Sequence, residues 1–368
     1  MFNNHNLRKQ RPSTHLSPGP SASLIQHTME WDELFQHALT TLPTATPAQW
    51  CQAFFLLAAG AVLAVAAMPR DAKTLLVDYG ARKAPTAPAD KSSPKSPDSG
   101  WLLPLVASIT SWTQVPHAWF SAFYVVSLAC SVFWLVQYLG KGTVLSYIVS
   151  SQTSGQEPSA TSGQVALGWL MMLLQGARRV FEHATIVKTS KSTMWVVHWL
   201  LGLLFYLSIN VAVWVEGSGM ASSLPGSCGT DLLTASAGAI LDPGARRHTD
   251  DAQSLLKMAV ALPAFLFAWV NQYRCHKHLA GLKKYSLPES GMFRRYICPH
   301  YTCECLLYFS MAIATAPHGA WCNRTLLCAL VFVTVNLGVT ASGTRKWYAD
   351  KFGSGPVASK WNMIPFLF

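Results

Sequence analysis

Seven long apolar stretches, separated by polar segments, limit the folds that this chain can adopt. A transmembrane helix needs roughly 20 predominantly apolar residues to cross the hydrocarbon core of a bilayer. The second, fourth and seventh stretches come close to that length, whereas the third is short and Pro317 interrupts the sixth. The pattern predicts an all-α, polytopic membrane protein with about seven transmembrane helices. The stretches lie at about 53–68, 119–139, 165–175, 194–215, 255–272, 305–321 and 326–342.

The composition favours the same class. Hydrophobic residues make up 51% of the 368 residues and charged residues only 12%, which are too few charges to cover a soluble globule of this size. The formal net charge is +11. No soluble basic domain exists to hold a nucleic acid, so we expect none as a partner.

The apolar stretches also predict the domain organisation. Residues 1–48 are polar and rich in proline, which is typical of a disordered tail, and residues 49–368 form one membrane domain. Segments with many polar, Gly or Pro residues predict flexible loops within that domain. These loops are 81–100, 150–163 and 217–254.

The basic residues predict the orientation of the spans. If seven spans are right, four segments on one side hold 6, 4, 6 and 4 Lys or Arg residues, or 20 of the 28 in the chain. Basic residues accumulate on the cytosolic side of membrane proteins, so we expect a cytosolic carboxyl terminus. Any single cation here can equally be a lipid headgroup contact. The four segments are 69–100, 178–192, 273–297 and the tail from 343.

Common metal and nucleotide motifs are missing. Cys298, His300, Cys303 and Cys305 cluster in the sequence, but their spacing does not match paired zinc ligands, so no metal is expected. The sequence has no Gly-x-Gly-x-x-Gly after a strand, no P-loop and no Gly-x-Ser-x-Gly. A bound nucleotide would therefore not lie on a Rossmann domain.

Three groups of polar residues are candidate functional sites. Gln272, His276 and Lys283 follow the fifth apolar stretch at offsets of four and seven, which would bring them to one helical face. An amide, an imidazole and an ammonium there could bind phosphate and ribose oxygens. A helix end whose cations face lipid headgroups explains the same pattern.

The second group lies at the start of the sixth stretch. Pro299 suits the first turn of a helix, and Glu304 would then lie one turn beyond His300, beside Tyr301. A carboxylate entering a bilayer is costly unless it is paired, so we expect a nearby Arg, Lys or His as its partner. A structural ion pair between two helices would satisfy the same physics.

The third group is the basic tail, with Thr344, Lys346, Tyr348 and Lys351. The chain then runs into an apolar Phe-Leu-Phe segment at 366–368. A buried Phe there would hold the tail against the bundle and place its cations over a cytosolic opening. A loose tail that binds headgroups is the alternative.

Four segments resemble the steroid 5-alpha-reductase family, and more closely its polyprenol (polyprenal) reductase branch. They are Cys298-Pro-His-Tyr-x-x-Glu304, Trp347-Tyr-x-x-Lys-Phe352 with the final Pro-Phe-Leu-Phe, the segment from Val115 to Tyr124, and Arg178-Arg179-x-x-Glu182. The resemblance covers roughly residues 115–368, apart from the loops at 150–163 and 217–254.

The resemblance implies an NADPH-dependent reductase of the endoplasmic reticulum membrane that acts in dolichol synthesis for protein N-glycosylation. It also implies that residues 265–368 form the cofactor-binding part of a seven-helix bundle with a cytosol-facing nucleotide site. Positions matching the family's nucleotide contacts or bracing residues are Gln272, His276, Lys283, His300, Tyr301, Glu304, Lys346 and Tyr348, with Arg178, Arg179 and Lys351 as additions.

The chain departs from the steroid enzymes of the family at the substrate. His276 and His300 replace their Asp and Asn, and the Glu that binds the steroid carbonyl falls at Phe123. A steroid ketone is therefore a poor candidate, and an aromatic groove suited to a polyprenoid lipid is expected instead. The groove residues are Trp112, Trp119, Phe120 and Phe123.

The reaction expected from the resemblance is reduction of the double bond in the first isoprene unit. Conjugation to an aldehyde makes the far carbon electrophilic, so hydride would add there, followed by a proton at the alpha carbon. A donor must polarise the oxygen, and we assign this role to Tyr124, with Glu304 as its support or as a nicotinamide anchor.

Two other functions fit parts of the pattern. Isoprenylcysteine methyltransferase-like membrane enzymes also place His-Tyr-x-x-Glu at a helix entrance, but an Arg normally stands where this chain has Cys298. A non-enzymatic lipid-binding or transport protein would explain the apolar helices alone.

Overall fold

The computed structural model describes most of the chain from residue 45 onward. Outside the described residues lie the predicted tail at 1–48 except for 45–48, the predicted loop at 81–100, and Trp112. The described residues are 45–68, 108, 113–153, 160–187, 192–215, 248–283, 285–317 and 319–368, without the side chains of 248–252.

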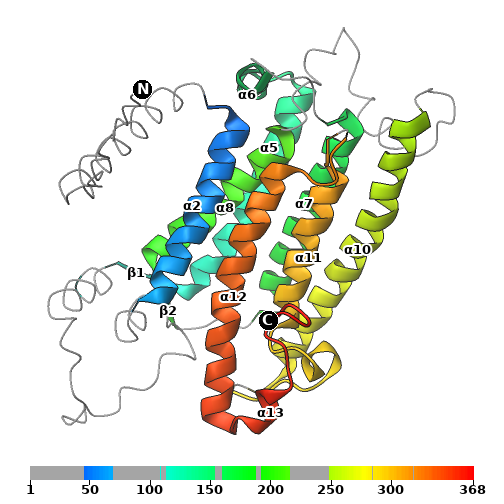
Figure 1. Ribbon diagram of the computed structural model, residues 1–368. Coiled ribbons are helices and arrows are strands. Elements are labelled where there is room, and N and C mark those ends of the chain that lie inside the picture. Colours follow the sequence, from blue (N-terminus) through cyan, green and yellow to red (C-terminus); the bar gives the residue numbers. More distant parts are fainter. Residues whose placement is uncertain are drawn as a thin grey trace, which may run out of the picture. The chain divides into compact units, whose positions relative to one another are not determined.

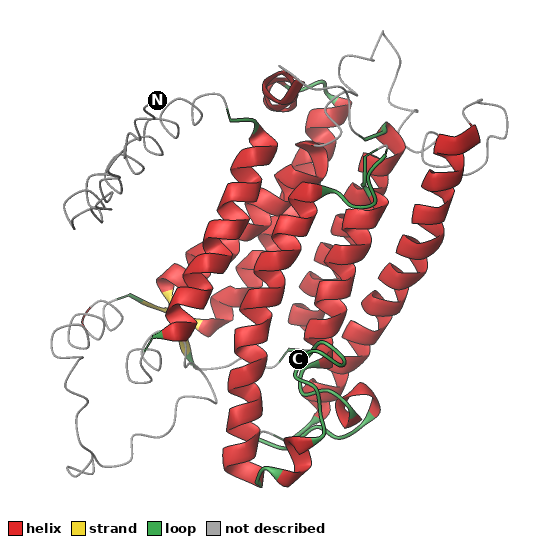
Figure 2. Cartoon of the chain, in the orientation of Figure 1, coloured by secondary structure: helices red, strands yellow, loops and turns green. Residues whose placement is uncertain are grey.

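Helices make up most of the described structure (Figure 2). They are α2 (Pro47–Ala67), α5 (Ser121–Leu139), α6 (Thr143–Thr153), α7 (Ser162–Thr185), α8 (Val196–Val215), α10 (His248–Gly281), α11 (Pro299–Ala314), α12 (Arg324–Phe352) and α13 (Gly355–Ala358), with the 3₁₀ helices η4 (His117–Phe120) and η6 (Gly291–Arg294). The strands β1 (Gln114–Pro116) and β2 (Thr193–Trp195) pair antiparallel, with Val115 opposite Met194. This small sheet ties the segment before α5 to the start of α8.

Local sequence explains where two helices begin. Thr46 precedes α2 and accepts a hydrogen bond from the Gln49 backbone, while the Gln49 side chain accepts one from the Thr46 backbone. Thr161 and Gln164 form the same reciprocal capping box before α7. Each box satisfies two backbone N–H groups that a helix start leaves without partners.

The helices that carry the carboxyl-terminal candidates have equally clear ends. Pro299 is the first residue of α11, which confirms the predicted helix start there. Asn323 caps α12 by accepting a hydrogen bond from Leu326 N at 3.0 Å. Helix α12 stops at Gly353, whose φ of +86° is a backbone conformation that glycine adopts readily.

The long helices from Thr46 onward pack into one bundle (Figure 1). Helix α10 packs along α11, α11 along α12, and α12 along α2, while α5 packs against both α7 and α8. One close contact requires a glycine. A Cβ atom at Gly202 in α8 would lie 2.6 Å from the Phe123 ring of α5.

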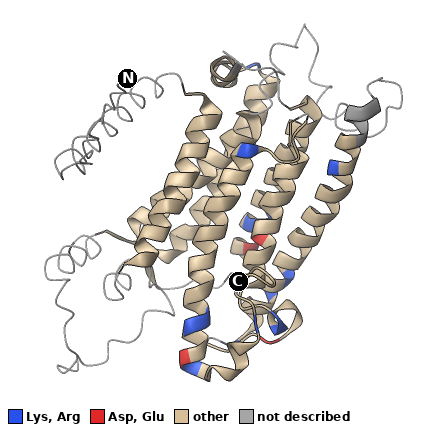
Figure 3. Ribbon diagram, in the orientation of Figure 1, with Lys and Arg blue, Asp and Glu red and all other residues tan. Residues whose placement is uncertain are grey.

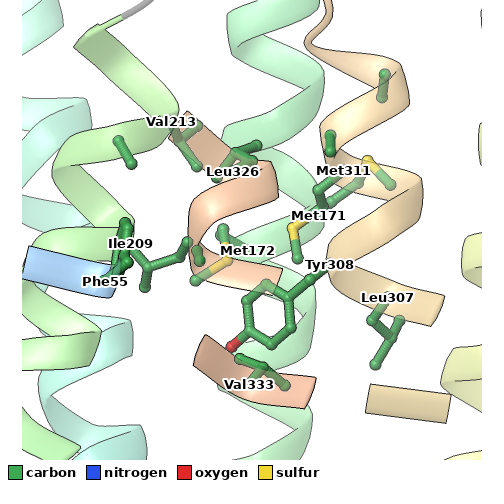
Figure 4. Close-up of a cluster of buried hydrophobic side chains, with 14 of the residues drawn as sticks. Phe55, Met171, Met172, Ile209, Val213, Leu307, Tyr308, Met311, Leu326 and Val333 are labelled. Carbon is green, nitrogen blue, oxygen red and sulfur yellow. The ribbon is translucent and has the colours of Figure 1, made fainter. Parts of the chain in front are cut away.

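Buried side chains from α2, α5, α7, α8, α10, α11 and α12 form the apolar core, and Figure 4 shows a part of it. Phe55 and Ile209 have no exposed surface, and they lie in one cluster with Met172, Tyr308 and Val333. Within a membrane, such side chains stabilise the bundle by close van der Waals packing between helices, since lipid is as apolar as the core. The core thus fixes α7 and α11 against their neighbours.

Each predicted apolar stretch lies largely in a helix. Among the described residues, five helices are long and apolar enough to cross a membrane: Pro47–Ala67, His117–Leu139, Val196–Val215, Gln253–Gly281 and Arg324–Phe352. Helices α7 and α11 pack in the same bundle, but neither is both long enough and apolar enough to count as a membrane-spanning helix. Helix α11 has only 16 residues, about 24 Å of helix, and α7 carries charged residues in its second half.

Several predicted boundaries were wrong. The basic loop expected at 178–192 begins inside α7, the tail expected from 343 is helical to Phe352, and the sixth stretch ends as a helix at Ala314. Parts of two predicted loops are also helical, because 150–153 belong to α6 and 248–254 to α10. Hydropathy predicts only the apolar part of a helix. A helix extends beyond that part where its polar side chains have hydrogen-bond partners, so its ends are missed.

Candidate active site

A buried polar network joins four helices at one end of the bundle. The second half of α7 and the last turns of α10 meet the first turns of α5 and α11 there. The members of the network are Tyr124 of α5, Gln175, Arg178, Arg179 and Glu182 of α7, Gln272 and His276 of α10, and His300 and Glu304 of α11.

Two interlocked glutamines form the centre of this network. The Gln272 carbonyl oxygen accepts hydrogen bonds from Gln175 Nε2 at 3.0 Å and from Arg178 Nη2. Its amide nitrogen donates to Glu304 and, at 3.3 Å, to the His300 carbonyl. All four hydrogen-bonding positions of this amide are used, so Gln272 has one well-defined orientation.

Glu304 has amide partners and the Tyr308 side chain, and it forms no salt bridge with a cation of the described residues. Its Oε2 atom accepts from Gln272 and, at 3.3 Å, from Gln175 Nε2. The expectation of an Arg, Lys or His as direct partner was therefore wrong. Two amide donors solvate the carboxylate. The positive charge of Arg178 also acts on it, with Gln272 hydrogen-bonded between the two.

Glu182 connects the cations of α7 to α10. It has no exposed side-chain surface and accepts from Arg178 Nη1 at 2.8 Å and from Arg179 Nη1. The His276 Nδ1 atom lies 2.7 Å from Glu182 Oε2 and 2.7 Å from Arg179 Nη1. Because Nδ1 either carries a proton or accepts one, His276 can hydrogen-bond to only one of these neighbours at a time.

Arg179 links this ionic group to Tyr124. Its Nη2 atom donates to the Tyr124 hydroxyl at 2.6 Å, and its guanidinium carbon lies 4.5 Å from the centre of the tyrosine ring. The hydroxyl oxygen accepts this bond, so its own hydrogen is available to another acceptor. Arg179 thereby fixes the position of the hydroxyl, and its positive charge favours negative charge on that oxygen against the larger opposing effect of burial.

Aromatic rings extend from Tyr124 towards the outside of the bundle. Phe120 lies 6.0 Å from Tyr124 and 4.7 Å from Phe123, measured between ring centroids. Trp119 is 46% exposed and pairs with Trp199 at 5.2 Å. Phe123 is buried against Gly202, so it packs between helices, whereas Phe120 and Trp119 keep accessible surface.

His300 and Tyr301 border the network at the start of α11. The His300 ring lies 5.6 Å from the His276 ring and 4.3 Å from the Tyr301 ring. Two buried atoms, Arg178 Nε and His300 Nδ1, have no hydrogen-bond partner in the described part of the chain. Such atoms can bind a ligand, so the residues present fit a group rich in oxygen acceptors, such as a phosphate or a carboxamide.

Three predicted basic residues do not join the network. Helix α10 ends at Gly281, so Lys283 is exposed beyond the helix and does not share a face with Gln272 and His276. Lys346 is exposed on α12. Lys351 Nζ lies 4.5 Å from the centre of the Tyr285 ring, in a cation–π contact.

Tyr348 and the tail belong to a second apolar cluster. Tyr348 is 9% exposed and packs with Cys298, Val357 and Met363. The Phe expected to be buried is only partly so, because the Phe368 ring lies against Gly338 of α12 but keeps 40% of its surface exposed.

Arg345 and backbone hydrogen bonds hold the tail against α12 and the start of α11. Arg345 donates to the carbonyls of Lys360 at 2.6 Å and Val357 at 2.8 Å. The backbone N–H groups of Ile297 and Cys298 donate to the tail carbonyls of residues 361 and 362 at 2.8 and 3.0 Å. An open depression of about 400 Å³ lies between this tail and α12, beside Arg345 and Lys346.

Arg345→Met should release the tail from α12. Hydrogen bonds from a charged donor are worth about 1.5–3 kcal/mol each, so losing them should speed cleavage within residues 353–361 by about tenfold or more. Limited proteolysis of detergent-purified protein, read by mass spectrometry, measures this. Lys346→Met is the matched control on the neighbouring exposed cation, and equal cleavage of both variants would contradict the role of Arg345.

Sequence reasoning missed Gln175, Glu182 and Arg345 as site residues. The spacing of the first two contains a usable signal, since Gln175 and Glu182 lie three or four residues from Arg178 and Arg179 on one helical face. Arg345 binds mostly backbone carbonyls, which leave no pattern in a sequence.

The sequence of this chain is similar to one protein family and to several known enzymes. Residues 241–368 match the family model described as 3-oxo-5-alpha-steroid 4-dehydrogenase. Polyprenal reductase 1 of Oryza sativa subsp. indica is 28% identical over 69% of this chain and 79% of its own length. Polyprenal reductases of Xenopus tropicalis and Caenorhabditis elegans are 26% and 24% identical over 70% and 71% of this chain, and 81% and 82% of their own lengths. The carboxyl-terminal third of this chain is therefore similar to the 3-oxo-5-alpha-steroid 4-dehydrogenase family, and most of the chain is similar to polyprenal reductases.

Proposed function

We propose that this protein is an oxidoreductase that reduces the first carbon–carbon double bond of polyprenal in dolichol synthesis, with NADPH as the cofactor. The observation that carries the proposal is the Tyr124 hydroxyl. It is buried near the end of an aromatic surface and accepts a hydrogen bond from Arg179, so its hydrogen can be donated to a substrate oxygen. The names of the similar proteins support the substrate.

The chain's part in the reaction follows from this contact. Tyr124 donates a hydrogen bond to the aldehyde oxygen and stabilises the negative charge that develops there. Arg179 supports the donor, because its positive charge lies against the ring and the hydroxyl. A bound nicotinamide dinucleotide would supply the hydride for the beta carbon. The proton for the alpha carbon would come from Tyr124.

The network and the basic residues around it would hold the dinucleotide. Arg178 and His300 offer unpaired buried nitrogen atoms, and Glu304 lies beside them to accept from an amide. Cations and rings nearer the surface would contact the phosphates and the adenosine part of the cofactor. The proposed cofactor-binding residues are Arg178, Arg179, Gln272, His276, Lys283, His300, Tyr301, Lys346, Tyr348 and Lys351.

The aromatic residues before and within α5 would receive the isoprenoid chain. Trp119 and Phe120 retain accessible surface on the path from the outside of the bundle to Tyr124. Phe123 contributes by holding α5 against α8 at Gly202. Trp112 stays a prediction outside the described residues.

Charge distribution supports a cytosolic position for this end of the bundle (Figure 3). Of the described Lys and Arg residues, only Lys141 after α5, Lys257 near the start of α10 and Arg324 at the start of α12 lie at or towards the opposite end. By the positive-inside rule, the site and the carboxyl terminus face the cytosol in a seven-span arrangement that includes α7 and α11. We place the enzyme in the endoplasmic reticulum membrane.

A substrate comparison tests the proposal. Membranes containing the protein are incubated with NADPH and polyprenal, polyprenol or a steroid enone, and the products are identified by mass. We expect saturation of polyprenal by two hydrogens and little conversion of the other two. No saturated product from any of them would contradict the proposal, and a melting temperature raised by S-adenosylmethionine but not by NADPH would favour a methyltransferase.

A further inference from the structure

We infer that Glu182 is a positioning residue that holds Arg179 against the Tyr124 hydroxyl. The inference rests on the proposed role of Tyr124 and gives a role to Glu182, which stands in the Arg178-Arg179-x-x-Glu182 segment but received none from the sequence. Glu182 has no hydrogen bond to Tyr124, so its contact with the hydroxyl runs through Arg179, and only its charge acts on Tyr124 directly.

The contacts of Glu182 carry the inference. One carboxylate oxygen accepts from Arg178 Nη1 at 2.8 Å, and the other contacts Arg179 Nη1 and lies 2.7 Å from His276 Nδ1. Glu182 lies three residues after Arg179 on α7, so one turn of helix sets their separation. The carboxylate thereby holds one guanidinium nitrogen while the other, Nη2, reaches Tyr124.

The positive charges of Arg178 and Arg179 require a nearby anion such as Glu182. Arg178 and Arg179 are adjacent in sequence, with side-chain exposures of 3% and 12%, and Glu182 with 0% lies between them. Two guanidinium groups in a poorly solvated site repel each other unless an anion separates them. Glu304 is occupied by the two glutamine amides, so within the described network Glu182 alone contacts both guanidinium groups directly.

Loss of the carboxylate should therefore move Arg179. Its Nη1 atom would keep only the imidazole nitrogen of His276 as a neighbour, and repulsion from Arg178 would act without compensation. The Tyr124 hydroxyl would then lose its charged partner and become a weaker donor.

A double-mutant cycle between Glu182 and Tyr124 tests the inference. Glu182→Gln keeps the shape but removes the charge, and we expect kcat with polyprenal to fall about tenfold or more, with KM changed less than about threefold. In a Tyr124→Phe background, Glu182→Gln should lower kcat by less than about twofold, because the hydroxyl that it serves is gone. Equal effects in both backgrounds, or an unchanged kcat in Glu182→Gln alone, would overturn the inference.

A second readout does not depend on activity. The same four proteins are compared by melting temperature in detergent, where Tyr124→Phe should lower the melting temperature in the native background and have less effect when Glu182 is replaced. Additive shifts would show that the two residues are not coupled. A wild-type protein that fails to reduce polyprenal contradicts the proposed function, whereas this thermal cycle still decides the role of Glu182.

Matched variants separate positioning from general loss of a carboxylate. Glu289→Gln removes an exposed carboxylate near the same end of the bundle and should leave kcat unchanged. Should Glu182→Gln fail to yield folded protein, Glu182→Asp replaces it in both cycles. The Asp variant keeps the charge but shortens the reach, so it should retain fold and show the same coupling to Tyr124, and the absence of coupling would again overturn the inference.

Discussion

Tyr124→Phe is expected to lower the turnover of polyprenal by about 10² or more, the usual contribution of a positioned acid. The variant removes the only group of Tyr124 that can donate to a substrate oxygen and leaves the ring in place. Arg179 would keep its contacts with Glu182 and His276, so the protein should still fold. Initial rates with a fixed amount of detergent-purified enzyme measure the effect.

The control is a tyrosine remote from the site. Tyr147 lies on α6 and is 72% exposed, so Tyr147→Phe should reduce polyprenal at the wild-type rate. Wild-type turnover in Tyr124→Phe would remove Tyr124 from the mechanism. Loss of turnover together with a lost folded state would point to packing instead.

Gln272→Leu is expected to disrupt the centre of the network and to have the largest effect on stability. Leucine has a similar size, but it removes one hydrogen-bond partner each from Arg178 Nη2, Gln175 Nε2 and Glu304 Oε2. Each of these atoms then keeps the bond that joins it to Gln175 or Glu304. Losing a hydrogen-bond partner from a buried polar group costs about 1–3 kcal/mol, and more if the group is charged, so the melting temperature should fall by roughly 5 °C or more. Turnover should fall by about 10², because Glu304 and Arg178 would shift by about an ångström.

Asn271→Leu is the matched control at the neighbouring position. Asn271 donates only to the Phe267 carbonyl of its own helix, at 2.8 Å, and is not part of the network. We expect a melting temperature and a rate close to those of the wild type. If the two leucine variants behaved alike, the network would not be the source of the stability.

The helices could be predicted from the sequence because apolar stretches report directly on burial. The helix ends could not be predicted in this way. Helix α7, for example, continues through a polar second half that hydropathy does not mark as helical. Arg178 and Glu182 stay helical because their partners lie on α10 and on the same face of α7. A sequence shows that a residue is charged but not that a partner from another helix satisfies it.

For the site as well, the sequence predicted some features correctly and others wrongly. Gln272 and His276 were correctly placed on one face because four residues of helix separate them. Lys283 was placed wrongly, since α10 ends at Gly281 before reaching it. The partner of Glu304 was also wrong, because amides as well as cations can solvate a carboxylate, and the sequence spacing does not distinguish them.

One isotope measurement tests the central claim that this network surrounds a nicotinamide-dependent reduction of a polyprenoid. Membranes with the protein are given polyprenal and NADPH deuterated at either face of nicotinamide C4, and the saturated product is analysed by mass spectrometry. We expect one of the two labelled cofactors to give a product with deuterium on the carbon beta to the aldehyde, and the Tyr124→Phe variant to give little of it. A saturated product without deuterium from either cofactor, or no saturated product at all, would contradict the account.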